Sequence, residues 1–211
     1  MGALNIVLAT RNPHKQEELM ALLDDLGLEI LTVDAFQNIP IIEETGSTCR
    51  ENAIAKARET AKLTGCWSLA DDTGLEVEAL GGRPGVHAAR YAGEEATYKD
   101  NWQKLLRELE GVPVGQRSAR FVTVVALADS AGHVEVAEGS LEGAIAQQPA
   151  GSEGFGYDPV FLIPNLGSTL SDMSLEQKNQ ISHRGQALRK AKVILQEKLS
   201  QLSASGRSAA R

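Results

Sequence analysis

Cysteines, aromatic side chains and long apolar runs are all scarce in this chain of 211 residues. The two cysteines, Cys49 and Cys66, suggest no disulfide scaffold, and they form no C-x-x-C pair that would favour zinc. No apolar run reaches the roughly 18 residues of a membrane-spanning helix, and the first residues lack the basic start of a signal peptide. We therefore expect a protein of the cytoplasm with no membrane partner.

Positive charge is also in short supply. The chain has 21 Lys and Arg against 28 Asp and Glu, which gives a formal net charge of -7. A general DNA or RNA binder would need a basic surface, so we expect no nucleic-acid partner. A few lysines and arginines that converge with a metal ion can still hold a polyanion. The composition therefore favours a small phosphorylated ligand.

Apolar periodicity and turn residues divide the chain into short strands and amphipathic helices. Short or alternating apolar runs predict strands at residues 4–9, 67–70, 75–80, 120–128, 134–137, 143–146 and 160–163. Residues that favour helix N-termini predict helices after Asn12, Thr48, Thr97 and Ser174, and an apolar stripe predicts a last helix from about Leu188 to Leu202.

The order of these elements predicts the fold class. Strands and helices alternate early and strands cluster in the middle, which is typical of an α/β fold with a mixed sheet and helices on its faces. No internal repeat or linker divides the chain. We therefore expect a single domain over residues 1–202 and a disordered tail at residues 203–211, where small polar residues dominate.

Five polar segments are candidates for chemistry, and the first is Thr10-Arg11-Asn12-Pro13-His14-Lys15. It follows a predicted strand and begins a helix, where a phosphate would meet unpaired N–H groups and the charge of Lys15. An ordinary strand-to-helix loop with a good cap explains the same residues. This segment alone is therefore a weak signal.

Acidic residues dominate the second and third segments, Glu43-Glu44-Thr45-Gly46 and Asp71-Asp72-Thr73-Gly74. The latter directly follows the strand predicted at residues 67–70. Adjacent carboxylates repel each other unless a cation lies between them. Mg²⁺ prefers oxygen ligands and usually bridges one or two carboxylates to substrate phosphates. The two segments together would make such a site, although a helix-start preference and a solvated turn explain them separately.

The fourth and fifth segments lie in the last third of the chain. Residues 153–159 place glycines around two aromatic rings, which suits a loop where a ring stacks on a flat ligand. A turn with core aromatics would have the same composition. Lys178, His183 and Arg184 could bind phosphate and donate to a base edge. Such polar clusters before a helix are also often merely solvated.

Together, the five segments resemble the inosine triphosphate pyrophosphatase family, the house-cleaning dITP/XTP pyrophosphatases. The resemblance covers residues 4–198 and rests on an ordered set of motifs, ATRNPHK, EETG, ADDTGLEVEALGGRPGVHAARYAG, GFGYDPVF and SHRGQAL. It implies an elongated mixed central β-sheet flanked by helices, with two lobes around a nucleotide-binding cleft, and usually a homodimer. It also implies Mg²⁺-dependent hydrolysis of ITP, dITP and XTP to the monophosphate and pyrophosphate.

The resemblance also implies roles for individual residues. Glu43 and Asp72 would be the metal carboxylates, and Asp72 would also be catalytic, as the proton acceptor for the attacking water. Glu44 and Asp71 are close enough in sequence to exchange roles with them, and Lys56 is a further candidate for a phosphate contact. The expected substrate-binding residues are Thr10, Arg11, Asn12, Pro13, His14, Lys15, Thr73, Phe155, Gly156, Tyr157, Asp158, Lys178, His183 and Arg184.

Two residues depart from the family pattern. Arg11 stands where glycine is frequent, and a side chain there could crowd the phosphates or add a charge; His14 stands where a small residue is common. Two other functions also stay open: a related pyrophosphatase for standard or modified pyrimidine nucleotides, and a nucleotide-binding sensor without catalysis. The paired carboxylates argue against the sensor, because phosphate binding alone would not need them. No G-x-G-x-x-G follows the first strand, which argues against an NAD-dependent oxidoreductase.

Overall fold

The computed structural model describes residues 4–208, and side chains up to residue 201. Its strands are β1 (Asn5–Leu8), β2 (Glu29–Thr32), β3 (Trp67–Val77), β4 (Pro84–Gly85), β5 (Ser118–Ala128), β6 (Val134–Ile145), β7 (Phe161–Ile163) and β8 (Ser168–Thr169). Its α-helices are α1 (Pro13–Leu23), α2 (Cys49–Thr64), α3 (Tyr98–Glu108), α4 (Leu175–Ile181) and α5 (His183–Ser208).

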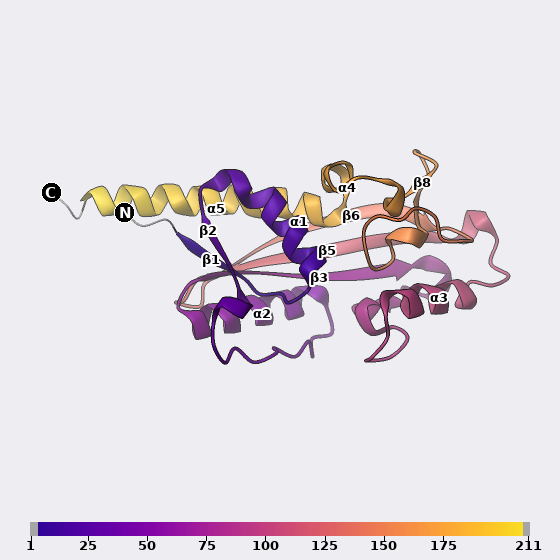
Figure 1. The fold of residues 1–211 in the computed structure, drawn as a ribbon, viewed down its shortest axis with the longest axis horizontal. Helices are drawn as coiled ribbons and strands as arrows, with labels where there is room; N and C mark the ends of the chain where they lie inside the picture. The colour runs from indigo at the N-terminus through magenta and orange to yellow at the C-terminus, as the bar shows by residue number, and fades with distance from the viewer. Residues whose placement is uncertain (1–3, 209–211) are drawn as a thin grey trace.

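A long mixed sheet forms the middle layer of the molecule (Figure 1). Within the described residues its strands run in the order β2-β1-β3-β5-β6-β7-β8, and β4 pairs with β3. β1 is parallel to β2 and β3, whereas β5 is antiparallel to both β3 and β6. The predicted α/β fold with a mixed central sheet is therefore confirmed.

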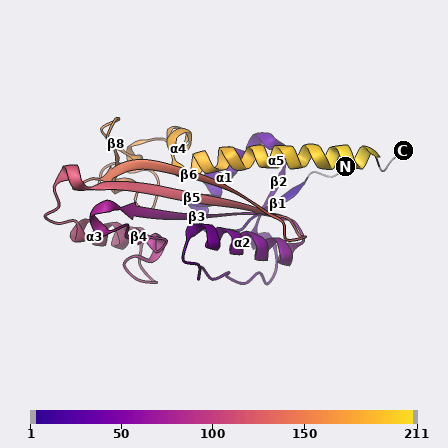
Figure 2. The same ribbon diagram turned by 180° about the vertical axis from the view of Figure 1, so that it is seen from behind.

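Helices cover both faces of this sheet. α1 and α5 lie on one face, and α2 and α3 lie on the other (Figures 1 and 2). One apolar cluster joins α3 to β7 and the adjacent end of the sheet, through residues such as Leu105 and Phe161. Two further clusters lie at the opposite end of the sheet. One packs α1 and α5 onto it through residues such as Leu195, and the other packs α2 onto it through residues such as Ala57. The apolar core therefore consists of separate clusters at the two ends of the sheet.

The ends of the helices follow the capping residues that the sequence predicts. The Asn12 side chain accepts hydrogen bonds from the first turn of α1, and Thr48 forms a capping box with Glu51 at the start of α2. Gly65 ends α2 with a φ of 70°, a left-handed conformation that glycine adopts without steric cost. These local signals therefore place the start of α1 next to the end of β1.

Three predictions about strands are wrong, one of them because residues 78–80, expected to end a strand, form a short 3-10 helix. The strand predicted at residues 67–70 continues through Asp71 and Asp72 to Val77, so both carboxylates lie inside β3 and not in a turn after it. Residues 134–137 and 143–146 belong to one strand, β6. Both long strands pair with β5 along most of its length, and this tertiary pairing overrides the low strand propensity of Asp and Gly.

The last helix extends farther than the sequence suggests. Residues 203–208, predicted as part of a disordered tail, continue α5, because adding residues to an existing helix is much easier than starting one. Residues 209–211 of that predicted tail lie outside the described residues. None of the described helices is both long and apolar enough to cross a bilayer.

Candidate active site

A cavity of about 380 Å³ brings together residues from all five sequence segments. Its walls come from the loop between β1 and α1, residues 39–42, Glu44, α2, β3, α3, the segment before β7, α4 and the start of α5. The predicted site residues that line it are Thr10, Arg11, Asn12, Lys15, Asp72, Thr73, Phe155, Gly156, Tyr157, Asp158, Lys178, His183 and Arg184. Pro13, His14 and Glu43 do not line it.

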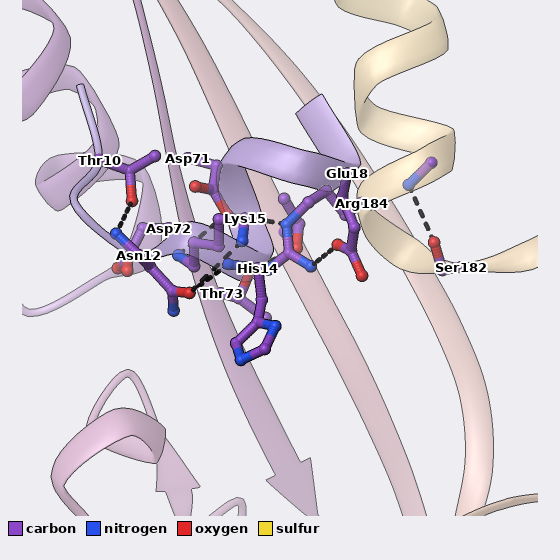
Figure 3. Close-up of polar contacts among 12 residues, drawn as sticks. Thr10, Asn12, His14, Lys15, Glu18, Asp71, Asp72, Thr73, Ser182 and Arg184 are labelled. Carbon is purple, nitrogen blue, oxygen red and sulfur yellow. Dashed lines mark hydrogen bonds and ion pairs between the residues drawn. The ribbon is translucent and has the colours of Figure 1, made fainter. Parts of the chain in front are cut away.

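Asp71 and Asp72 point to opposite faces of the sheet, because side chains alternate along a strand. On the α1 and α5 face, Lys15 Nζ lies 3.0 Å from Asp71 Oδ2, and Arg184 Nε donates to the same oxygen at 3.0 Å (Figure 3). On the α2 face, Asn52 Nδ2 donates to Asp72 Oδ2 at 3.2 Å. The repulsion expected between adjacent carboxylates is thus relieved by the strand itself.

The two aspartates differ in basicity as well as in direction. Burial would raise the pKa of Asp71, but Lys15 and Arg184 hold this pKa well below its ordinary value. Burial raises the pKa of Asp72 above its ordinary value, opposed by Lys56 and assisted by the negative charge of Glu44. Asp71 therefore stays ionised as an anchor for the two cations, and Asp72 is the better proton acceptor.

Glu44, and not Glu43, faces this carboxylate. Lys56 Nζ forms an ion pair with Glu44 and lies 3.7 Å from Asp72 Oδ1. Arg90 Nη1 lies 3.7 Å from the second carboxylate oxygen of Glu44. Glu43 is exposed. The placement therefore favours Glu44 over Glu43 as the partner of Asp72, a one-residue exchange that the sequence left open.

The chemistry of these two carboxylates fits a hard divalent cation. Glu44 raises the pKa of Asp72 through like charge, and a divalent cation would offset this repulsion further than Lys56, which already lies beside both carboxylates. Among the described residues, no group of three or more His, Cys, Asp or Glu side chains could hold a metal ion by itself. Two carboxylates completed by substrate phosphates match the usual coordination of Mg²⁺.

Behind the cavity wall, buried ion pairs join α1 to α4 and α5. Lys178 Nζ lies 2.7 Å from Glu18 Oε1 and also pairs with Asp158. Arg184 forms an ion pair with Glu18 and donates to Thr73 Oγ1 at 3.1 Å. Although burial opposes it, the two cations lower the pKa of Glu18. Sequence reasoning missed Glu18, whose only signal is a carboxylate beside an apolar position of α1.

Hydrogen-bond donors remain available at this wall. Arg184 has five N–H groups, and within the described residues it uses three of them on protein oxygens. Burial and the charge of Arg184 hold the pKa of His183 well below its ordinary value, so its imidazole is neutral. The His183 ring stacks on Phe121 with ring centroids 4.3 Å apart. The wall therefore offers a fixed guanidinium and a neutral imidazole to a ligand.

Three aromatic rings meet at the edge of the cavity. The His14 ring stacks on Phe155 with centroids 5.2 Å apart, and the Tyr98 ring lies 5.7 Å from Phe155. Asn12 Nδ2 donates to the Tyr98 hydroxyl at 2.7 Å, which connects α1 to α3 across the cavity. His14 thus supports Phe155 from outside the cavity. Tyr98 lines the cavity, although the sequence gave no reason to select it.

Arg11 does not crowd the loop between β1 and α1. Its Nη2 donates to the backbone oxygen of Ile39 at 2.7 Å, and its Nε lies 3.6 Å from Asp34 Oδ1. Arg11 thereby connects this loop to the segment that leads to Glu44. The charge of Arg11 stays at the cavity wall, and the Asn12 side chain accepts from the backbone N–H groups of His14 and Lys15.

Comparisons with known proteins address the family and the fold of the chain. The model of the Ham1 family matches residues 6–194. The chain is 47% identical over 192 residues to the dITP/XTP pyrophosphatase of Desulforamulus reducens, covering 91% of this chain and 96% of that relative. It is 50% identical over 189 residues to the dITP/XTP pyrophosphatase of Shigella flexneri, covering 87% and 94%.

Two solved structures are also similar over most of their length. A HAM1 protein from Coxiella burnetii has a TM-score of 0.84 and 45% identity, covering 92% of this chain and 99% of that chain. A nucleoside-triphosphatase, or dITP/XTP pyrophosphatase, from Mycobacterium abscessus has a TM-score of 0.73 and 39% identity, covering 89% and 98%. The elongated mixed sheet is therefore shared with both.

Proposed function

The chain belongs to the Ham1 family, and on this premise we propose that it hydrolyses non-standard purine nucleoside triphosphates to the monophosphate and pyrophosphate. The relatives that match nearly the whole chain are named dITP/XTP pyrophosphatases, so we expect dITP, XTP and ITP as substrates. The observation that carries the proposal is the cavity that Lys15, Asp72 and Lys178 share.

The cavity walls supply the groups that a triphosphate needs. The N-terminus of α1 points its helix dipole toward the cavity, and Lys15 in its first turn adds a positive charge. Lys56 adds a second charge beside Asp72. Lys15 pairs with Asp71 at 3.0 Å, so its ammonium is already fixed before a phosphate arrives. Such preorganised charges stabilise the developing negative charge of phosphoryl transfer.

Asp72 would take the proton from the attacking water, as its raised pKa allows. The water would attack the α-phosphorus in line, breaking the bond to the bridging oxygen, and pyrophosphate would leave with that oxygen. Glu44 and Asp72 would hold Mg²⁺, which supplies charge neutralisation at the phosphates and a lower pKa for a bound water. Asp71 would keep Lys15 and Arg184 in place.

The preference for hypoxanthine and xanthine over adenine is expected to come from hydrogen-bond donors at the cavity wall. Arg184 donates hydrogen bonds and cannot accept them, so it can serve the 6-carbonyl of hypoxanthine or xanthine but not the 6-amine of adenine. An unsatisfied buried polar group costs about 1–3 kcal/mol, which corresponds to roughly a 5- to 150-fold preference for the carbonyl. Guanine shares this carbonyl, so its exclusion would depend on contacts around its 2-amine.

A nucleotide panel tests the substrate class. We expect ITP, dITP and XTP to release equimolar monophosphate and pyrophosphate with Mg²⁺ and neither product with EDTA, and ATP to react about 5- to 150-fold more slowly. Equal rates for ATP and ITP would contradict the donor argument. A preference for pyrimidine nucleotides would support the rival pyrophosphatase, and nucleotide binding without any product would support the sensor.

Phe155 is expected to stack on the base. Base–aromatic stacking contributes about 1–3 kcal/mol, so Phe155→Ala should raise KM for ITP by roughly 5- to 150-fold with a smaller change in kcat. Phe155→Tyr, which keeps the ring, is the matched control and should retain the KM. Steady-state kinetics would measure both variants, and an unchanged KM in Phe155→Ala would contradict a stacking role.

The biological role proposed here is removal of these nucleotides from the nucleotide pool. Hydrolysis to the monophosphate would prevent a polymerase from using the altered base. The cytoplasmic location that the composition predicts and the homodimer that the resemblance implies both stay predictions. Gel filtration with light scattering would measure the oligomeric state directly.

A further inference from the structure

Helix α2 presents polar side chains to the sheet as well as alanines. Asn52 and Lys56 are four residues apart, so they lie on the same side of the helix. Asn52 is 2% exposed and does not line the cavity. A buried primary amide is costly unless its donor and acceptor are both satisfied, so the partners of Asn52 explain its position.

The Asn52 side chain connects the two acidic segments of the site. Its Nδ2 donates to Asp72 Oδ2 at 3.2 Å, and its Oδ1 accepts from the backbone N–H of Gly46 at 2.7 Å. Gly46 follows Glu44 by two residues. One planar amide on a well-capped helix therefore spans from β3 to the segment that carries Glu44, and both its nitrogen and its oxygen have protein partners.

The glycine at position 46 is explained by the same contact. A Cβ atom on Gly46 would lie 2.6 Å from Asn52 Oδ1 and 2.7 Å from the Cβ of Glu51. Any larger residue would push the backbone away from the helix and lengthen the hydrogen bond to Asn52. The close approach of this segment to α2 thus depends on Gly46 and Asn52 together.

Asn52 also orients the carboxylate of Asp72. Because Asn52 binds Oδ2, this oxygen is held toward α2, and Oδ1 is the oxygen that lies 3.7 Å from Lys56 Nζ. The ring-like arrangement of Asn52, Lys56, Glu44 and Asp72 is closed by the ion pair between Lys56 and Glu44. The relative position of the two carboxylates is therefore set from α2.

We propose that Asn52 is a positioning residue that fixes the separation and orientation of Asp72 and Glu44, and thereby sets the rate of hydrolysis after the nucleotide has bound. The proposal rests on the function proposed above. Reacting groups must be held to within about 0.5 Å of the productive geometry. Asn52 acts through Asp72 and the Gly46 segment and has no contact with the cavity, so it affects the reaction step and not the nucleotide affinity.

Two substitutions at Asn52 test the proposal. Asn52→Ala removes both hydrogen bonds, whereas Asn52→Asp keeps the acceptor for Gly46 and replaces the donor with a charge that repels Asp72. Loss of a supporting hydrogen bond behind a reactive group typically lowers activity by about 10- to 100-fold, so we expect this fall in kcat for both. The KM, and the calorimetric Kd of ITP in EDTA, should stay within about twofold of wild type.

Gly46→Ala provides a variant with Asn52 intact. It displaces the Gly46 segment from the other side and should show the same fall in kcat without loss of ITP affinity in EDTA. If Asn52→Ala does not fold, Gly46→Ala and Asn52→Asp still decide the matter. Wild-type kcat in a folded Asn52→Ala, or in Gly46→Ala, would overturn the proposal, as would a loss of ITP affinity large enough to account for the lower kcat/KM.

Thr48→Ala is the matched control on the same helix. Thr48 Oγ1 accepts from the backbone N–H of Glu51 at 3.2 Å and caps α2 without touching either carboxylate. Its loss should lower the unfolding temperature and leave kcat unchanged. If Thr48→Ala lowered kcat as much as Asn52→Ala does, the role of Asn52 would be structural only, and the proposal would be wrong. Failure of the wild-type enzyme to release pyrophosphate from ITP would instead refute the proposed function itself, and this inference with it.

Discussion

Asp72→Asn is expected to lower kcat for ITP by about 100- to 10,000-fold, the usual contribution of a positioned proton acceptor. The amide cannot accept a proton from water, and one of the two carboxylates that face each other is lost. Pyrophosphate release at saturating ITP and Mg²⁺ would measure the effect. A folded Asp72→Asn protein with near-normal turnover would contradict the assignment of Asp72.

The same variant should not lose stability. A carboxyl whose pKa is higher in the folded state than in the unfolded state binds its proton more tightly when folded. Its contribution to stability therefore falls as the pH rises from the unfolded pKa to the folded pKa. Burial raises the pKa of Asp72 in this way. In EDTA at neutral pH, Asp72→Asn should therefore unfold at the same temperature as wild type or at a higher one. Any such gain should disappear as the pH falls below the ordinary carboxyl range.

Glu18→Gln is expected to cause the largest loss of stability, about 3–5 kcal/mol, the typical cost of removing one partner of a buried ion pair. Glu18 is 3% exposed and pairs with both Lys178 and Arg184. Glutamine keeps the shape but leaves the two buried cations with less compensation. Urea denaturation followed by circular dichroism would measure the change in the free energy of unfolding.

The contribution of Glu18 to stability depends on pH in the opposite direction to that of Asp72. The cations lower the pKa of Glu18 in the folded state, so its stabilisation is present above the unfolded pKa and is lost as the pH falls through the folded value. The difference between wild type and Glu18→Gln should therefore shrink in acid. Glu17→Gln, at the exposed neighbouring position, is the control and should stay within about 0.5 kcal/mol of wild type. Equal losses in both variants would contradict the role given to the buried pairs.

Much of the fold and of the site could be predicted because the information is local. The cap at Asn12, the capping box of Thr48 and the terminator Gly65 depend only on neighbouring residues, and all three are confirmed. Most of the site residues that the ordered motifs selected also line the cavity. Local chemistry thus located the start of α1, and the resemblance to the family selected the segments around the cavity.

The errors arise where tertiary pairing decides the outcome. The sequence Asp71-Asp72-Thr73-Gly74 is typical of a turn, yet pairing with β5 extends the strand through it. Only this extension sends the two aspartates to opposite faces. The choice between Glu43 and Glu44 depends on the path of a segment without periodicity, which the sequence cannot fix to one residue.

Two buried polar residues show a further limit. Glu18 and Asn52 each lie next to an apolar inward position, Leu19 and Ala53. Such residues interrupt the apolar face of an amphipathic helix, and a pattern analysis counts them as exceptions. Their partners lie on other elements: Arg184 is 166 residues from Glu18 in the sequence, and Asp72 is 20 residues from Asn52. An interrupted apolar face is therefore the sequence signal that deserved weight here.

The position of bond cleavage tests the central claim most directly. If ITP is hydrolysed in water enriched in ¹⁸O, attack at the α-phosphorus should place one labelled oxygen in IMP and none in pyrophosphate, as mass spectrometry of the two products would show. Label in the pyrophosphate, or release of orthophosphate in place of pyrophosphate, would mean that the water attacks another phosphorus. Either result would contradict the geometry assigned to Asp72, Lys15 and the cavity they share.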